Sequence, residues 1–373
     1  MMKKFLLTAI AVAITLISQV NAGMSFQGLG DLPGGRFGNI AYGISADGSI
    51  IVGQSYSASG REAFRWNAND GMIGLGNLPS ARFDSNASDV SSDGSTIVGV
   101  SQSASGYEAC RWSADGGIIG LGDLPGGSFY SYAGGMSANG STIVGYSQSA
   151  SGFEAFRWNA NDGMIGLGDL PGGDFSSNAT DISADGSTIV GGGKSASGRE
   201  AFRWTEDNGM IGLGDLPGGD FSSNATGISA DSSTIVGNSQ SASGIEVFRW
   251  TEADGMMGLG DLPGGDFYSE ARGVSADGSV IVGRASSASG DAAFIWDQEN
   301  GMIGLSDMLT ANGVDINGWR LIDATGISAD GLTFMGNGFN PNGNYEAWVA
   351  TVPEPATLSL LALGALAFRR RRA

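Results

Sequence analysis

The sequence contains no histidine, and this absence removes several classes of functional site at once. Imidazole is the general base of Ser-His-Asp triads and a common zinc ligand, so His-based triads and most zinc sites are excluded. There is one cysteine, Cys110, and a single thiol cannot form an internal disulfide. Cys110 stands where similar stretches of the chain carry Phe64 and Phe156, which favours a small core residue over a reactive thiol.

Charged residues are also scarce, at 15% of the chain, and their formal balance is -19. Six of the 19 basic residues are Lys3, Lys4 and the run Arg369 to Arg372, so the stretch between the two ends is even more acidic. Such a surface repels phosphate backbones, so nucleic acid is not an expected partner. Acidity fits a solvated, exported protein, and this explanation is simpler than cation binding.

The apolar runs of the chain are short. The first extends from Phe5 to Ile17, follows Lys3 and Lys4, and precedes the small-residue site Val20-Asn21-Ala22. This pattern predicts a secretory signal peptide over residues 1–22 that is removed after Ala22.

Glycine, in contrast, is abundant, since 64 residues indicate many tight turns. From Gly23 to Val352 the chain repeats a unit of 46 residues. One tryptophan marks each of six copies without a slip: Trp66, Trp112, Trp158, Trp204, Trp250 and Trp296. A SADG element recurs with the same period, and self-similarity of this kind predicts a propeller, a solenoid or an array.

Each unit contains four strand-sized segments, such as SNASDVS, STIVGVS, EACRW and GIIGLGDL in the second copy. An Asp-Gly pair joins the first two segments, and a second turn rich in Asp and Gly joins the last two. Four short antiparallel strands per unit are typical of a propeller blade. The sequence therefore predicts an all-β fold, a seven-bladed β-propeller of four-stranded antiparallel blades, over residues 23–352.

The ends of the repeat region predict a closed ring. The first GLGDLPGG element, at Gly28, precedes the first SADG, whereas the chain ends at EAWVATV without a fourth strand. An open solenoid would need caps at both ends and gains nothing from this offset. We expect the N-terminal strand to complete the last blade, with residues 26–32 beside residues 347–351. The last copy also carries seven extra residues before its SADG element, interpreted as an adjustment at the closure.

The tail combines Pro353-Glu354-Pro355, a short apolar stretch and four arginines. In this order the three parts resemble the PEP-CTERM sorting signal of Gram-negative bacteria, here residues 353–373. The resemblance implies that an exosortase-type membrane enzyme recognises Pro353, Glu354 and Pro355. It also implies export through the inner membrane, transient anchoring by the C-terminal helix, and release to the envelope surface or the extracellular space. The arginines would stay cytoplasmic.

The repeat unit resembles the HAF family of extracellular repeat proteins, in which a SADGSTIVG-like stretch precedes His-Ala-Phe-Arg-Trp. Here the second stretch reads Glu62-Ala63-Phe64-Arg65-Trp66 and its equivalents, with Glu in six copies and Ala292 in one. The family has no agreed activity, so the resemblance implies only a shape and an extracellular address.

Two features of that stretch admit a functional and a structural explanation. Phe64 and Trp66 alternate with Ala63 and Arg65 along a predicted strand. An aromatic sugar platform remains open, but packing between wedge-shaped blades is the favoured explanation. Arg65 and its equivalents are expected to pair with a carboxylate such as Glu62 or an Asp of the GLGD element.

No cofactor or metal site is expected. The Asp-rich turns NANDG and SADGS leave calcium as an open alternative, but neither reproduces a known calcium-loop spacing, and Asp before Gly is explained by turn formation. The glycines form neither a GxGxxG leading into a helix nor a GK[ST] loop. The acidic residues are too periodic to single out a glycosidase pair.

Positions that vary between near-identical copies are either free of structural duty or adapted to a ligand. Two such positions lie in the first, channel-lining strand and one in the loop between the second and third strands, which we expect on the same face of the ring. Together with a nearby Phe they make a candidate binding face: Phe37, Tyr42, Tyr56, Asn86, Gln102, Tyr132, Gln148, Asn178, Lys194, Asn224, Gln240, Glu270 and Arg272. Neutral drift after duplication remains the simpler cause of the variation.

We therefore expect an exported, monomeric, non-enzymatic propeller that acts as a binding or structural module of the bacterial envelope or extracellular matrix, with extracellular polysaccharide as a partner. The alternative is a glycan-active enzyme with its site at the central channel. The lack of histidine and of a unique carboxylate cluster favours the first.

Overall fold

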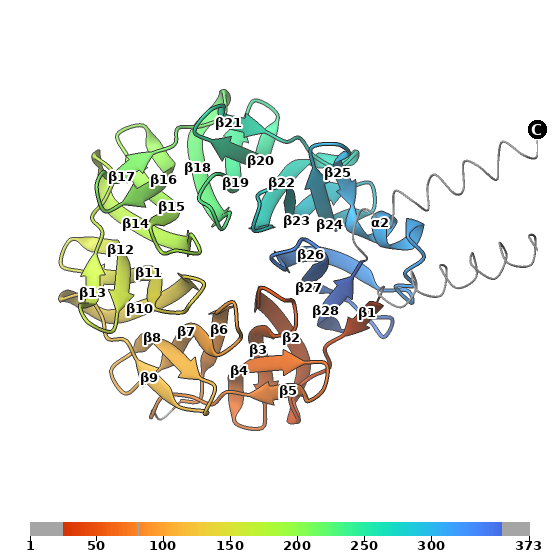
Figure 1. Ribbon diagram of the computed structural model, residues 1–373, viewed down its shortest axis with the longest axis horizontal. Helices are drawn as coiled ribbons and strands as arrows, with labels where there is room; N and C mark the ends of the chain where they lie inside the picture. The colour runs from red at the N-terminus through yellow and green to blue at the C-terminus, as the bar shows by residue number, and fades with distance from the viewer. Residues whose placement is uncertain (1–24, 81, 353–373) are drawn as a thin grey trace, which may run out of the picture.

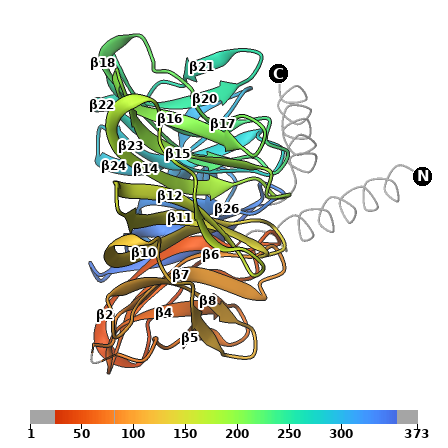
Figure 2. The ribbon, with the colours of Figure 1, turned by 90° about the vertical axis from the view of Figure 1, so that its left-hand side faces the viewer.

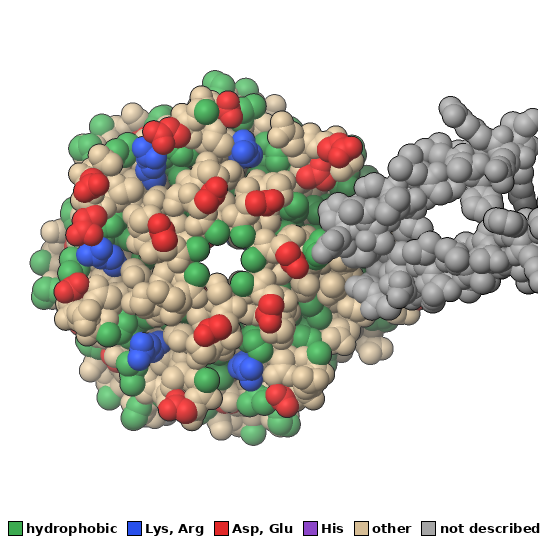
Figure 3. Space-filling model, in the orientation of Figure 1, with side chains coloured by type: hydrophobic (Ala, Val, Ile, Leu, Met, Phe, Trp, Pro, Cys, Tyr) green, Lys and Arg blue, Asp and Glu red, His purple; other side chains and the backbone are tan. Residues whose placement is uncertain are grey.

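The computed structural model describes residues 25–80 and 82–352. Its strands are arranged around a central opening (Figure 1), which stays open between the side chains in Figure 3. Seen from the side, they form a shallow disc (Figure 2). The predicted signal peptide, residues 1–22, and the sorting segment, residues 353–373, lie outside the described residues. Among the described residues, no helix is long and apolar enough to cross a membrane.

Each repeat builds a group of four antiparallel strands, and we name each group after its first strand. The β2 group consists of β2 (Gly34–Ile44), β3 (Ile51–Ser57), β4 (Gly60–Asn67) and β5 (Gly71–Gly74). The β6 group consists of β6 (Ser85–Val90), β7 (Thr96–Gln102), β8 (Tyr107–Ser113) and β9 (Ile118–Gly120). The β10 group consists of β10 (Gly126–Met136), β11 (Thr142–Ser149), β12 (Gly152–Asn159) and β13 (Gly163–Gly166). The β14 group consists of β14 (Gly172–Ile182), β15 (Thr188–Ser195), β16 (Gly198–Thr205) and β17 (Gly209–Gly212).

The remaining groups follow the same plan. The β18 group consists of β18 (Gly218–Ile228), β19 (Ile235–Ser241), β20 (Gly244–Thr251) and β21 (Gly255–Gly258). The β22 group consists of β22 (Gly264–Val274), β23 (Val280–Ser287), β24 (Gly290–Asp297) and β25 (Gly301–Gly304). The last repeat supplies three strands, β26 (Arg320–Ile327), β27 (Thr333–Phe339) and β28 (Tyr345–Thr351). The all-β, propeller-like fold predicted from the sequence is confirmed.

Neighbouring groups are not fully separate sheets. Single parallel pairs, such as Phe153 with Ser176 and Arg199 with Ser222, connect the third strand of one group to the first strand of the next. These pairs join the β10, β14, β18 and β22 groups into one sheet of 16 strands.

The two ends of the described chain meet in one group. β1 (Ser25–Gly28) pairs antiparallel with β28, from Ser25 opposite Thr351 to Gly28 opposite Trp348, and becomes the fourth strand beside β26 to β28. The Phe26 ring lies 5.4 Å from the Trp319 ring and 6.1 Å from the Trp348 ring. An N-terminal segment thus supplies the strand that the last repeat lacks.

The SADG turns link the groups to one another. In the β14 group, Asp185 accepts hydrogen bonds from the Ser183 hydroxyl at 2.7 Å and the Ser187 amide at 2.9 Å. The amide of Ala184 donates to the carbonyl of Ala230 in the next turn at 3.2 Å. Equivalent bonds run from Ser92 to Ala138, Ala138 to Ala184, Ala230 to Ala276, Ala276 to Ala329 and Ala329 to Ala46. A chain of backbone hydrogen bonds therefore connects the successive turns from Ser92 through Ala329 to Ala46.

The aromatic residues of the third strands form the core. Phe64, Phe156, Phe202, Phe248 and Phe294 are fully buried, so these residues pack between groups and form no sugar platform. Cys110, at the same position, is also fully buried, and burial raises the pKa of its thiol. A buried, neutral thiol fits the small core residue that the sequence predicts.

The expected partner of the third-strand arginine was wrong. Arg157 lies over the Trp204 ring of the next group, at 5.6 Å, and pairs with Glu206 at 3.4 Å. The glutamate of the same strand, Glu154, instead accepts a hydrogen bond from the Gly168 amide at 3.1 Å. Residues three apart in a strand point to opposite faces, so Arg157 and Glu154 cannot meet.

The extra residues of the last repeat include a short helix that the sequence did not predict. α2 (Leu305–Ala311) replaces the turn that follows the fourth strand elsewhere, and it buries Leu305 and Leu309. Leu305, Met308 and Leu309 have the spacing of one helical face.

Candidate functional site

Each inner strand carries a β-bulge at the same place, and the bulge residue faces the central channel. The pairing of β2 with β3 skips from Ala41 to Gly43, leaving Tyr42 without a partner, and the other groups show the same shift. A bulge re-aims a side chain and interrupts the ladder locally. The bulge residues are Tyr42, Ser88, Gly134, Thr180, Thr226, Arg272 and Thr325.

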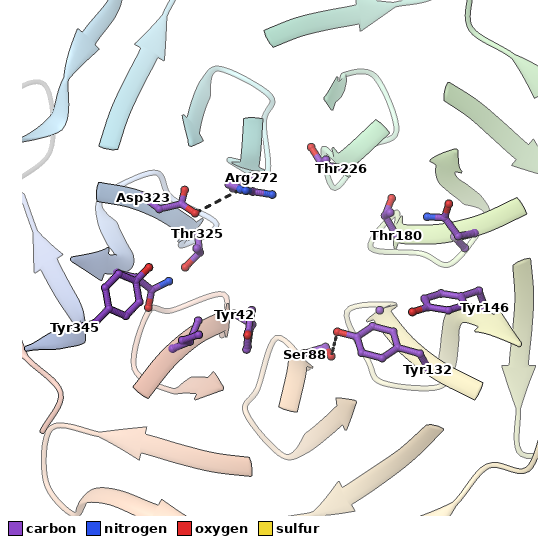
Figure 4. Close-up of a pocket in the computed structure, with 15 residues that line it drawn as sticks. Tyr42, Ser88, Tyr132, Tyr146, Thr180, Thr226, Arg272, Asp323, Thr325 and Tyr345 are labelled. Carbon is purple, nitrogen blue, oxygen red and sulfur yellow. Dashed lines mark hydrogen bonds and ion pairs between the residues drawn. The ribbon is translucent and has the colours of Figure 1, made fainter. Parts of the chain in front are cut away.

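All seven bulge residues line one pocket of about 470 Å³ in the channel. Tyr132, Tyr146 and Tyr345 join them, and Figure 4 shows these side chains around the opening. The repeat therefore builds a single central site to which every group contributes its bulge residue, and these residues are of five types.

One side of this channel pocket is aromatic. Tyr132 and Tyr146 face each other across β10 and β11, with ring centroids 5.4 Å apart. Ser88 donates a hydrogen bond to the Tyr132 hydroxyl at 2.7 Å (Figure 4). Burial raises the pKa of Tyr42 to about 12 and raises the pKa of Tyr132. The phenols therefore stay neutral and present aromatic faces with hydroxyl tips.

The opposite side is charged. Arg272 lies 2.9 Å from Glu270 and 3.5 Å from Asp323. Burial raises the pKa of Asp323, and the nearby Arg272 opposes this effect. Within the described residues, Asp323 Oδ1 is buried without a hydrogen-bond partner. Asp323 and Arg272 nevertheless both line the pocket, so this side offers charged groups to a ligand.

The threonines of the pocket have a structural duty. Thr180 donates to the carbonyl of Ala225 at 3.0 Å, and Thr226 donates to that of Ala271 at 2.9 Å. Thr325 does the same to Ala41 at 3.0 Å, across the junction of the chain ends. Each hydroxyl thus ties one group to the next, so variation at this position is not free of structural constraint.

The structure gathers only part of the predicted binding face. Tyr42, Tyr132, Asn178 and Arg272 line the pocket. Three more members of the predicted face, Asn86, Asn224 and Glu270, lie outside the lining. On their own inner strands they are equivalent to Tyr132 and Asn178. The others also lie outside the lining, at the ends of second strands or in β2: Phe37, Tyr56, Gln102, Gln148, Lys194 and Gln240.

Several of these outer residues already have partners. The Arg36 guanidinium lies 3.8 Å from the centre of the Tyr56 ring, and Lys194 pairs with Asp174 at 3.3 Å. Arg199 donates to the Asn224 side chain at 2.8 Å. These contacts give the outer positions local roles on the surface.

Two carboxylates beside the bulges, outside the lining of the channel pocket, were missed by sequence reasoning. Asp89 and Asp181 follow bulge residues at a position that is Gly43, Gly135, Gly227, Gly273 and Gly326 elsewhere. Burial raises the pKa of Asp89 to about 6 and, together with the charge of Asp89, raises the pKa of Asp181 to about 7. The sequence reasoning expected no unique carboxylate cluster, and Asp89 with Asp181 are two acidic residues that the other copies lack. The signal was the change from Gly to Asp in two copies.

Both carboxylates also connect neighbouring groups. Asp89 Oδ2 accepts a hydrogen bond from the Met136 amide at 2.9 Å, and Asp181 Oδ2 accepts one from the Ile228 amide at 3.0 Å. Over residues 25–80 and 82–352, no three His, Cys, Asp or Glu side chains are placed to hold a metal ion.

Comparisons with known proteins identify the tail and the fold. Residues 351–373 match the PEP-CTERM protein-sorting motif, which confirms that part of the sequence prediction. This motif is the signal for exosortase processing and implies export with transient anchoring by the tail. Pro353, Glu354 and Pro355 lie within it, outside the described residues. No curated protein matches the chain.

Among solved structures, an oligogalacturonate lyase from Vibrio parahaemolyticus is similar with a TM-score of 0.54 at 10% identity, over 89% of this chain and 98% of the other. TolB from Acinetobacter baumannii gives 0.47 at 13% identity, over 71% of this chain and 62% of TolB. The Dos1 propeller gives 0.45 at 10% identity, over 88% and 95%. Identities this low concern the fold alone.

Proposed function

We propose that the protein is an exported, closed seven-bladed β-propeller whose channel pocket binds an extracellular polysaccharide. The observation that carries this proposal is the pocket itself, because Tyr42, Tyr132, Tyr146 and Tyr345 line it together with the polar side chains of Arg272 and Asp323. Sugar rings offer apolar faces to aromatic rings and hydroxyls to polar groups, and this pocket supplies both partners. The pairing of β1 with β28 supports closure of the ring.

The proposed setting is the envelope or extracellular matrix of a Gram-negative bacterium. The sorting motif supports export and processing by an exosortase-type enzyme. We also assign the repeat to the HAF type, supported by the recurring SADG turn and the Phe-Arg-Trp stretch. We propose a monomer without catalytic activity that acts as a binding or structural module.

Affinity electrophoresis of the full-length chain tests this function. The gels contain dextran, laminarin or hydroxyethyl cellulose as neutral polymers, and alginate as an anionic one. We expect at least one polymer to retard the protein, and the Tyr42→Thr variant to bind it about tenfold more weakly. The equivalent residues of the β14 and β18 groups are Thr180 and Thr226, so the variant should fold. Equal retardation of variant and wild type, or none by any polymer, would contradict the proposal.

The second candidate is a glycan-active enzyme at the channel, and Asp89 with Asp181 specifically favours it. Two carboxylates with pKa values of about 6 and about 7, raised mainly by burial, could share acid and base roles near neutral pH. Their backbone hydrogen bonds are also explained by structure alone. Release of reducing ends from the same polymers, abolished by Asp181→Asn, would establish the enzyme.

A further inference from the structure

A strip of aromatic side chains continues from the channel pocket over the β10 group. Tyr132 and Tyr146 belong to the pocket, and the Tyr146 ring lies 6.1 Å from Tyr130 and 5.8 Å from Phe153. Tyr130 in turn lies 5.9 Å from Phe153 and 6.2 Å from Tyr107 of the β6 group. Together these five rings form a continuous surface, which we call the aromatic strip.

The aromatic strip is accessible. Phe153 is 44% exposed, and the other four rings are partly exposed. Most of their contacts are edge-on or tilted, which leaves ring faces uncovered. An exposed aromatic patch that continues from a pocket marks a binding surface more often than a chance cluster does.

The fold does not require these aromatic residues. The position of Tyr130 is Ser in the β14 and β18 groups, and that of Tyr146 is Gly192 and Asn238. The position of Phe153 is Arg199 in the β14 group, where its guanidinium bonds to Asn178 and Asn224. The β14 group, with the same strands, thus fills these places with small and polar residues, so packing alone does not explain the aromatic strip.

Charge selects among ligands for the strip. Asp84, which accepts a hydrogen bond from the Tyr107 hydroxyl at 2.8 Å, pairs with both Arg61 at 2.6 Å and Arg82 at 3.2 Å, so this cluster carries one net positive charge. The chain as a whole is nevertheless strongly acidic, at -19. An anionic polymer would be repelled by this field, whereas an uncharged one would not.

We infer that the aromatic strip is an extended subsite that holds successive sugar units of an uncharged polysaccharide chain whose end or middle occupies the channel pocket. The inference rests on the proposed function of that pocket. Each ring would stack on the apolar face of one sugar, while the Tyr hydroxyls bond to sugar hydroxyls. A chain of several units therefore binds more tightly than a short oligosaccharide of the same sugar.

Chain length and sister-group residues together provide the test. Tyr130→Ser and Phe153→Arg introduce residues that the β14 group carries naturally, and Met257→Ser, which removes a side chain 52% exposed on the β21 strand, is the control. Calorimetry measures the binding of the full-length variants to two pairs of ligands, each a polymer and its disaccharide. The pairs are laminarin with laminaribiose and dextran with isomaltose. Unfolding midpoints confirm that every variant is folded.

We expect each strip variant to bind the polymer about tenfold more weakly, with unchanged affinity for the disaccharide and an unchanged control. Strip variants that keep full affinity for the polymer, while Tyr42→Thr loses it, would overturn the strip and leave the proposed function standing. Wild-type chains that bind neither polymer nor disaccharide would overturn both. Preferential binding of alginate would overturn the uncharged class.

Discussion

At the scale of single residues, the SADG turn shows how strictly one backbone conformation is used. Its last residue has a positive φ in every group, between +67° and +79° where it is Gly. In the β18 group this residue is Ser232, with φ of 66°. A side chain in this left-handed region costs about 1 kcal/mol relative to glycine.

Ser232→Gly should therefore stabilise the protein by about 0.5–1 kcal/mol. The reverse change in a sister turn, Gly186→Ser, should destabilise it by a similar amount, because its surroundings leave room for a side chain and only the backbone is strained. Chemical denaturation of both variants measures the two effects. If both substitutions changed the unfolding free energy in the same direction, the backbone conformation of this turn residue would not be the cause.

At the scale of elements, the third strand holds the turn after the fourth strand. Glu200 Oε1 accepts a hydrogen bond from the Gly214 amide at 3.0 Å, and the equivalent glutamates make equivalent bonds. In the β22 group the glutamate is replaced by Ala292, and there α2 takes the place of the turn. The third-strand glutamate therefore has a structural duty wherever the turn is present.

Glu200→Ala should destabilise the protein by about 1–2 kcal/mol, because the Gly214 amide loses its acceptor in a partly buried turn. Glu206→Ala, which removes the same charge from an exposed hairpin, is the control and should change little. Thermal unfolding compares the two. Equal losses would show that the carboxylate does not hold the turn.

Much of the arrangement of strands and turns could be predicted from the sequence. Strand number, the Asp-Gly turns and the buried Phe of each third strand follow from the repeat, since each copy repeats the same local preferences. The helix α2 did not follow, because a single seven-residue element gives no periodic signal. The prediction of the partner of Arg157 also failed, because that partner, Trp204, belongs to the next group and only the packing of the two groups brings the side chains together.

The candidate site was less accessible to prediction. Tyr42, Tyr132, Asn178 and Arg272 were selected because they vary between copies, and the pocket contains them. Tyr146 lies in a strand that appeared wholly structural. Asp323 was missed because the insertion shifts the last repeat out of register. Bulges decide which residues face the channel, and no single copy of the sequence marks them.

At the scale of the whole molecule, the fold brings carboxylates of two separate groups, Asp89 and Asp181, close enough for one charge to raise the pKa of the other. Asp181 has its pKa raised to about 7 by burial and by the charge of Asp89, whereas an unfolded chain keeps the ordinary value of 3.8. The folded state therefore holds the proton more tightly. The stability it contributes is complete below about pH 4 and is lost as the pH rises through about 7.

Asp181→Gly, which introduces the residue of most sister groups, should remove this dependence. Relative to wild type, the variant should gain stability on the order of 2–4 kcal/mol at pH 8 and little at pH 4. Asp207→Asn, which removes a carboxylate from an exposed turn, is the control. Unfolding free energies across this pH range test the prediction, and a difference between variant and wild type that does not grow with pH would refute it.

The ring also orients the molecule. Ser25 pairs with Thr351, and the Val352 amide donates to the Leu332 carbonyl at 2.9 Å, so both ends of the described chain lie beside the last SADG turn. The channel pocket and Tyr345 lie toward the opposite end of the strands.

The central claim is that the channel pocket binds an extracellular polysaccharide. The most direct measurement is calorimetric titration of the Tyr42→Thr/Tyr132→Asn double variant and of the wild type with the polymer that retards the wild type in the gels. Both substitutions introduce residues that sister groups carry, so the ring is retained while the aromatic side of the pocket is removed. The account predicts saturable binding by the wild type and a loss of at least about tenfold, or about 1.4 kcal/mol, in the folded variant. An unchanged affinity in the folded variant would contradict it.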